Sequence, residues 1–154
     1  MKNTMRTWRA FRRLDRDDRR LAMETVAALA ATRIGLRLTG LRRWKAALGR
    51  GTPRLDCAGS EGTGILVARR IARIQEAVSR HLTWHASCLE RSLVLWWQLE
   101  RHGIAAEMRI GARKEAGRFE AHAWVELGNL VLNDSSDPHL HFTPFDDSIL
   151  SMET

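Results

Sequence analysis

Residues 87–134 read SCLERSLVLWWQLERHGIAAEMRIGARKEAGRFEAHAWVELGNLVLND, and the spacing of their apolar residues changes part-way along. Before Gly103 the apolar residues recur every three or four positions, which is the spacing of a helix face. They include Leu89, Leu93 and Trp96. After Gly103 apolar and polar residues alternate, which is typical of a half-buried strand. The alternating apolar residues are Ala106, Met108, Ile110 and Ala112. Residues 119–127 and 130–134 continue as two further strands, so the stretch predicts a helix followed by an antiparallel sheet.

The chain before residue 87 predicts further helices, because three stretches carry apolar residues at helical spacing. These stretches are residues 18–35, 41–48 and 63–80. A glycine-rich segment between them is typical of a linker. The resulting divisions are a basic helical region (1–50), a linker (51–64) and a domain (65–154). Helices first and strands last predict an α+β fold, in which N-terminal helices and a central cysteine-bearing helix pack on a small antiparallel sheet. Residues 135–154 contain two prolines and several acidic residues and are expected to be irregular.

The composition suits one compact domain that works in a reducing compartment. With 154 residues, of which 44% are apolar, the chain is long enough to bury a core. Its two cysteines, Cys57 and Cys88, are too few for a disulfide framework. The N-terminus lacks the apolar core of a signal peptide, and charged residues interrupt the most apolar early stretch, residues 21–38. We therefore expect a cytoplasmic protein without a membrane span.

Positive charge is concentrated at the N-terminal end, although the net charge of the whole chain is only +7. Residues 1–50 hold 14 Lys and Arg against 4 Asp and Glu, a balance of +10. Residues 51–154 hold 11 against 14, a balance of −3. One interpretation is a docking surface for an acidic partner, and the other is a set of helices with solvated arginine faces. No nucleic-acid motif or aromatic stacking platform accompanies the charge, so we expect no nucleic-acid partner.

Cys88 lies where a helix is predicted to begin. Ser87 followed three residues later by Glu90 is the signature of a capping box, which makes Cys88 the first residue of the helix. The N–H groups and the dipole at this end of a helix favour a thiolate, the reactive form of cysteine. The alternative is an inert cysteine buried in the core. Cys57 lies in the linker with no helix start after it, and we interpret it as incidental.

A thiolate nucleophile needs an imidazole to carry a proton and an acid to orient that imidazole, and a predicted hairpin supplies both. His122 lies within the strand 119–127, and Asp134 ends the next strand. A three-residue loop centred on Gly128 would place His122 opposite Asp134, with their Cβ atoms about 5 Å apart. A two-residue loop would turn Asp134 to the other face, so we expect an odd-length loop or a bulge. His122 and Asp134 would then face the cysteine-bearing helix.

Each of these residues also has a structural interpretation, His122 as a satisfied histidine of the sheet and Asp134 as a turn former. Glu126 is a weaker candidate for the acid, because it lies four residues along the strand from His122. His139 and His141 are two residues apart but lack further cysteine or histidine partners, so we expect no metal site and no cofactor. The predicted catalytic residues are Cys88, His122 and Asp134.

Five short motifs in this part of the chain carry a family resemblance. They are Cys-Leu-x-Arg-Ser-Leu at 88–93, Arg-x-Gly at 101–103, Ile-Gly at 110–111, Ala-His-Ala-Trp-Val-Glu at 121–126 and Asn-Asp at 133–134. Together they resemble the transglutaminase-like leader peptidases of lasso-peptide biosynthesis, known as B proteins. The resemblance is to the stand-alone form, in which the leader-binding module is a separate chain.

The resemblance implies a papain-like arrangement of nucleophile, base and acid on Cys88, His122 and Asp134. It implies a bacterial cysteine endopeptidase that cleaves the leader from a ribosomally made precursor peptide through an acyl-enzyme. It also implies two protein partners. One is a leader-binding recognition protein that presents the precursor, and the other is an asparagine-synthetase-like cyclase that receives the core peptide.

Two other functions fit the same residues. An acyl transferase would use the same three side chains and pass the acyl group to an amine instead of water, so only the product would distinguish it from a peptidase. A non-catalytic scaffold built on the basic N-terminal region would keep its function after loss of the Cys88 thiol.

Overall fold

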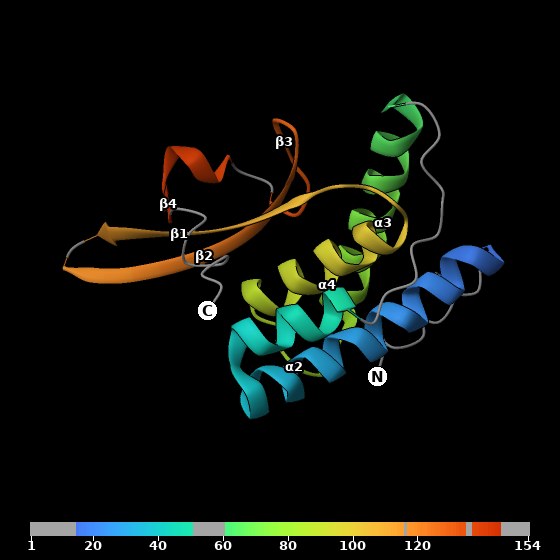
Figure 1. The fold of residues 1–154 in the computed structure, drawn as a ribbon, viewed down its shortest axis with the longest axis horizontal. Coiled ribbons are helices and arrows are strands. Elements are labelled where there is room, and N and C mark those ends of the chain that lie inside the picture. The colour runs from blue at the N-terminus through green and yellow to red at the C-terminus, as the bar shows by residue number, and fades with distance from the viewer. Residues whose placement is uncertain (1–14, 51–60, 116, 135–136, 146–154) are drawn as a thin grey trace.

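The computed structural model describes residues 15–50, 61–115, 117–134 and 137–145. These residues form three helices packed on a small four-stranded antiparallel sheet, which confirms the predicted α+β fold (Figure 1). The elements are α2 (Arg16–Arg50), α3 (Glu61–His81), α4 (Cys88–Arg101), β1 (Glu107–Glu115), β2 (Arg118–Leu127), β3 (Leu130–Val131), the 3₁₀ helix η1 (Pro138–Leu140) and β4 (Thr143–Pro144).

α2 is a helical hairpin, because the chain turns back on itself at Gly40. This residue has φ 77° and ψ 172°, a conformation that glycine adopts without strain. After the turn, the Trp44 ring lies against Gly35, where a Cβ atom would come within 2.3 Å of the ring. The indole Nε1 of Trp44 donates a hydrogen bond to Thr32 Oγ1 at 3.2 Å. The two helices predicted on either side of Gly40 are therefore the two arms of α2.

The core lies where α2, α3 and α4 meet the sheet. One apolar cluster joins α3 and α4 to β2; it contains Ala68, Ile71, Ala72, Leu95, Leu99, Ile104, Ala106 and Val125. A second cluster ties α2 to the start of α4 through Leu29, Ala86 and Val94. A buried hydrogen bond from Gln98 Nε2 to Thr25 Oγ1, 2.9 Å long, also joins α4 to α2. Because α2 contributes Leu29 and Thr25 to the interior, it is part of the folded domain.

The helices end and begin near their predicted positions, with one change beside the linker. α3 begins at Glu61, so residues 61–64 are helical, although they were predicted as linker. Residues 51–60, which include Cys57, lie outside the described residues. Among the described residues, no helix combines the length and the apolar character that crossing a membrane requires.

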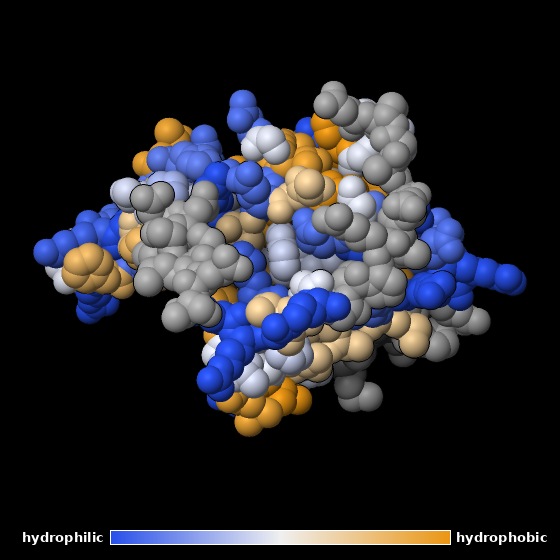
Figure 2. Space-filling model, viewed as in Figure 1, coloured by the Kyte–Doolittle hydropathy of each residue, from blue (hydrophilic) through white to orange (hydrophobic). Residues whose placement is uncertain are grey.

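The sheet has the strand order β3–β2–β1–β4. β1 and β2 pair from Glu107–Glu126 to Glu115–Arg118 and form a long hairpin that extends beyond the helices (Figure 1). Most side chains at the far end of this hairpin and on the first turns of α2 are hydrophilic (Figure 2), and Phe119 is an exposed apolar residue near the β1–β2 turn. β4 pairs with β1 through Gly111–Pro144 and Ala112–Thr143. Residues 137–145, predicted to be irregular, therefore contribute η1 and β4. A two-residue strand leaves no periodic pattern that a sequence could reveal.

Candidate active site

Cys88 is the first residue of α4 and directly follows Ser87, the N-cap residue of the predicted capping box. The Ser87 hydroxyl accepts a hydrogen bond from the Glu90 N–H at 3.2 Å, and the Glu90 carboxylate accepts one from the Ser87 N–H at 2.8 Å. The thiol is half-buried and packs against the cluster of Leu93, Met108 and Ala123. The partial positive charge of the helix N-terminus therefore lies beside a cysteine that is not sealed in the core.

His122 and Asp134 are in direct contact. The imidazole Nε2 lies 2.6 Å from the carboxylate Oδ2, and both side chains are about one-fifth exposed, at 22% and 18%. The predicted contact between these residues is therefore confirmed. Because Asp134 occupies Nε2, the Nδ1 atom, which bonds to no other group of the described residues, is the nitrogen left for proton transfer.

The hairpin between β2 and β3 makes this contact in a way that differs from the prediction. Leu127 pairs with Leu130, so the loop is the two-residue turn Gly128–Asn129, and the predicted three-residue loop is wrong. This register alone would turn Asp134 away from His122. The chain instead bends at residues 132–133, directly after β3, and the bend brings Asp134 back to the side of His122.

The side chain of Asn133 holds this bend. Its Oδ1 accepts a hydrogen bond from the Val125 N–H at 2.8 Å, in the place of a strand carbonyl. Its Nδ2 donates to the Ser92 hydroxyl at 2.9 Å, and that hydroxyl donates to the Ala123 carbonyl at 2.8 Å. Ser92 and Asn133 fall within the motifs of the sequence, yet the spacing of residues gave them no role. Their role depends on a contact between segments 41 residues apart.

The side chains of β2 that point toward α4 are not the ones that were predicted to do so. Ala123 and Val125 pack into the clusters that α4 forms with the sheet. His122 and Trp124 alternate with them and so lie on the opposite face. There the His122 ring stacks on Phe142, with centroids 5.1 Å apart. The expectation that His122 faces the cysteine-bearing helix is therefore wrong, because the alternate apolar residues of β2 form the core face.

Cys88 and His122 nevertheless lie beside the same edge of β2. Ser92 is one helical turn after Cys88 on the same side of α4, so their Cβ atoms are about 5–6 Å apart. The Ser92 hydroxyl reaches the Ala123 carbonyl, which belongs to the residue next to His122. β3 pairs with β2 only at Glu126 and Leu127, so among the described residues this edge has no strand partner beside His122. The structure contains no hydrogen bond between Cys88 and His122.

Glu126, the weaker candidate for the acid, has other partners. Its Oε1 accepts a hydrogen bond from Trp124 Nε1 at 2.5 Å and lies 2.5 Å from His139 Nε2. Its Oε2 lies 3.7 Å from Arg109 Nε. Glu126 therefore fastens η1 to the sheet and does not contact His122. Within the described part of the chain, no group of three or more His, Cys, Asp or Glu side chains could hold a metal ion.

Trp124 explains why the Ile-Gly motif at 110–111 is needed on the neighbouring strand. The Trp124 side chain is fully buried and extends over Gly111, where a Cβ atom would come within 2.9 Å of the ring. The same Cβ atom would come within 2.9 Å of the Thr143 carbonyl oxygen. The absence of a side chain at Gly111 thus allows the Trp124 ring and β4 to pack closely against β1. The Trp124 ring in turn stacks beside the His122 ring.

Residues 22–146 match the family model of the transglutaminase-like superfamily, a range that covers most of the chain and all the candidate catalytic residues. The chain belongs to the transglutaminase-like superfamily. This superfamily includes cysteine-dependent enzymes, among them peptidases and acyl transferases. The range matched to the transglutaminase-like family begins within α2 and ends beyond β4. Comparisons with curated proteins and with solved structures gave no match.

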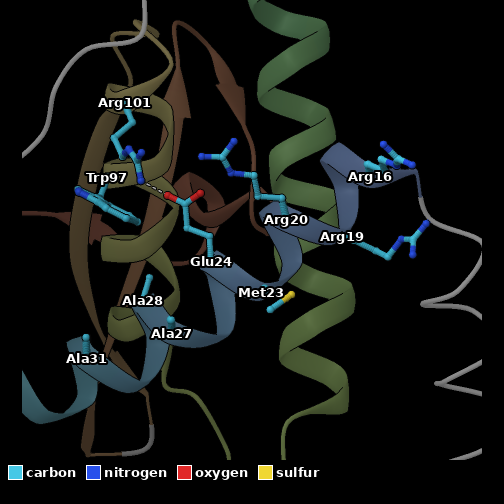
Figure 3. A pocket seen from close by; sticks show the side chains of 10 residues that line it. All are labelled: Arg16, Arg19, Arg20, Met23, Glu24, Ala27, Ala28, Ala31, Trp97 and Arg101. Atoms are coloured by element: carbon cyan, nitrogen blue, oxygen red, sulfur yellow. Dashed lines mark hydrogen bonds and ion pairs between the residues drawn. The ribbon is translucent and has the colours of Figure 1, made fainter.

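A groove of ≈ 820 Å³ lies between the first arm of α2 and α4, on this transglutaminase-like domain (Figure 3). The small side chains Ala27, Ala28 and Ala31 of α2 form one wall, and Trp97 of α4 forms the other. Arg101 lies over the Trp97 ring and pairs with Glu24. Further arginines surround the start of α2; they are Arg16, Arg19 and Arg20.

Proposed function

We propose that this chain is a cysteine peptidase that cleaves the leader from a ribosomally made lasso-peptide precursor. The observation that carries the proposal is the hydrogen bond between His122 and Asp134 at the edge of β2. Ser92, one helical turn after Cys88, contacts the same edge through the Ala123 carbonyl. Membership of the transglutaminase-like superfamily supports a cysteine-dependent reaction. The resemblance of the motifs at 88–93, 121–126 and 133–134 to the B proteins supports leader cleavage.

In the proposed reaction, the Cys88 sulfur attacks the carbonyl carbon of the scissile bond. His122 receives the thiol proton at Nδ1 and returns it to the leaving amine, while Asp134 holds the ring through Nε2 and stabilises the imidazolium. Water then attacks the thioester and releases the leader with a free carboxylate. The Cys88 N–H at the start of α4 is one donor for the oxyanion. The hydrogen bond between thiol and imidazole would form when substrate binds, since such bonds are often long or misaligned in enzymes without substrate.

The test is cleavage of the precursor, followed by the intact mass of the products. The wild-type chain should yield a leader whose mass includes one added water, and Cys88→Ala should yield no cleavage. Cys57→Ala, which removes the other thiol, is the matched control and should cleave normally. A leader released as an amide would instead identify an acyl transferase. Unchanged function after Cys88→Ala would identify a scaffold.

We further propose that a separate leader-binding protein docks on the first arm of α2. The apolar stripe Met23, Val26, Ile34 and Leu38 is exposed there, because α2 buries the other side, which carries Ala22, Thr25, Leu29 and Thr32. The groove of Figure 3 continues this stripe. Arg16 and Arg20 beside the groove favour an acidic partner surface with apolar residues at its centre. The cyclase would then receive the core peptide after release.

A further inference from the structure

A second cavity, of ≈ 350 Å³, lies beside the N-terminus of α4. Its walls are the end of α3, the segment of residues 82–86, and Arg91 of α4. This segment leads directly into Ser87 and Cys88, and Arg91 is three residues after Cys88. Arg33 of α2 fastens the segment by donating a hydrogen bond to the His85 carbonyl at 3.1 Å. The cavity is therefore a fixed depression within one helical turn of the proposed nucleophile.

The residues that line this cavity carry no negative charge. They include two arginines, Arg80 and Arg91, and one histidine, His85, but no Asp or Glu. Arg80 pairs with Glu76 at 3.4 Å in an exposed i,i+4 pair on α3. Arg91 makes no ion pair with any of the described residues. A half-buried guanidinium without a counter-ion gives this cavity a positive potential that an anion would neutralise.

Three of the lining residues also carry a buried polar atom without a hydrogen-bond partner. These atoms are Ser79 Oγ, Trp84 Nε1 and Arg91 Nε. All three can donate a hydrogen bond, and the indole and guanidinium atoms can do nothing else. Buried donors without an acceptor are uncommon in folded proteins, so three around one cavity indicate an acceptor from outside the chain, either ordered water or a ligand that displaces it.

We propose that this cavity is a subsite that binds the side-chain carboxylate of an acidic residue of the peptide substrate, close to the scissile bond. A guanidinium favours a carboxylate over a neutral amide, because the hydrogen bond is then assisted by charge. The indole N–H and the serine hydroxyl supply further donors for the second carboxylate oxygen. Only one part of this proposal rests on the proposed peptidase function, namely that the carboxylate belongs to a peptide. Binding of a carboxylate can be measured without cleavage.

The test is an NMR titration of the full ¹⁵N-labelled chain with two neutral-backbone probes, N-acetyl-aspartate amide and N-acetyl-asparagine amide. The Trp84 indole N–H is the reporter, assigned by its disappearance in Trp84→Phe. We expect the aspartate probe to shift this resonance saturably, with a Kd at least tenfold lower than that of the asparagine probe. Arg91→Gln should raise the Kd for the aspartate probe at least tenfold. Arg73→Gln, an exposed arginine of α3 outside the lining, should leave it unchanged.

Equal responses to the two probes in the wild-type chain would overturn the proposal, and this comparison does not depend on whether Arg91→Gln folds. A full response retained in a well-dispersed Arg91→Gln spectrum would also overturn it. The outcome is separate from the peptidase function. Selective aspartate binding without precursor cleavage would support the subsite and contradict the peptidase function. Precursor cleavage with equal responses to the two probes would support the peptidase function and contradict the subsite.

Discussion

The Nε2 atom of His122 and the Oδ2 atom of Asp134 lie 2.6 Å apart, although β2 and β3 do not pair with each other at either residue. The contact depends on the bend after β3 and not on continuous strand register. Asn133 fixes that bend between Val125 and Ser92, and Ser92 belongs to the helix that begins with Cys88. One short network therefore links the geometry of the acid to the position of the nucleophile helix.

Asp134→Asn should lower kcat for precursor cleavage by about 10²–10⁴-fold, with a smaller change in KM. The amide preserves the size of the side chain but no longer stabilises a positively charged His122 ring. Steady-state kinetics on the purified variant check this. Glu126→Gln is the matched control, because Glu126 contacts Trp124 and His139 and not His122. If Glu126→Gln lost as much activity as Asp134→Asn, the assignment of the acid would be wrong.

Asn133→Ala should lower both stability and activity. The substitution leaves the Val125 N–H without its side-chain acceptor, which costs about 1–3 kcal/mol of the free energy of unfolding. It also frees the bend that carries Asp134 to His122. Urea unfolding and kcat measured on the same preparation check the two effects. Normal kcat in a destabilised variant would show that the bend does not position Asp134.

Gly111→Ala should destabilise the domain by about 1–3 kcal/mol, because the added methyl group meets the Trp124 ring and the Thr143 carbonyl. Gly62→Ala is the control. It is the second residue of α3 with nothing within 4 Å of the added Cβ, so the substitution should change stability by less than about 0.5 kcal/mol. Thermal or urea unfolding distinguishes the two. Equal effects of both substitutions would contradict the close packing of Trp124 on Gly111.

The double variant Arg16→Glu and Arg20→Glu should weaken binding of the leader-binding protein on the order of tenfold at low salt, and reduce the salt dependence of binding. Both residues are exposed, so the fold should be unaffected. Arg43→Glu is the control, because it changes the charge by the same amount per residue but lies on the other arm of α2. Charge reversal is cleaner here than deletion of residues 1–50, since α2 contributes Leu29 to the core. Binding that does not change would place the partner elsewhere, and weaker binding of the isolated leader alone would identify the peptide as the occupant.

The sequence predicted those features that depend on neighbouring residues. The change of apolar spacing after Gly103 indicated α4 and the β1–β2 hairpin, and Ser87 with Glu90 indicated the start of α4. Features that depend on distant segments were not predictable in the same way. The Asn133 bend needs Ser92, and β4 needs the open edge of β1 at Gly111. The apolar alternation of β2 did contain the information that His122 lies away from the core face, since Ala123 and Val125 are its apolar neighbours.

The measurement that tests the central claim most directly is the product mass from precursor treated with wild-type, Cys88→Ala and Cys57→Ala chains, each with the leader-binding protein present. We predict a free leader with a C-terminal carboxylate from the wild-type and Cys57→Ala chains, and intact precursor from Cys88→Ala. Cleavage by a folded Cys88→Ala chain would contradict the account, because the nucleophile would then be a group other than the Cys88 thiol.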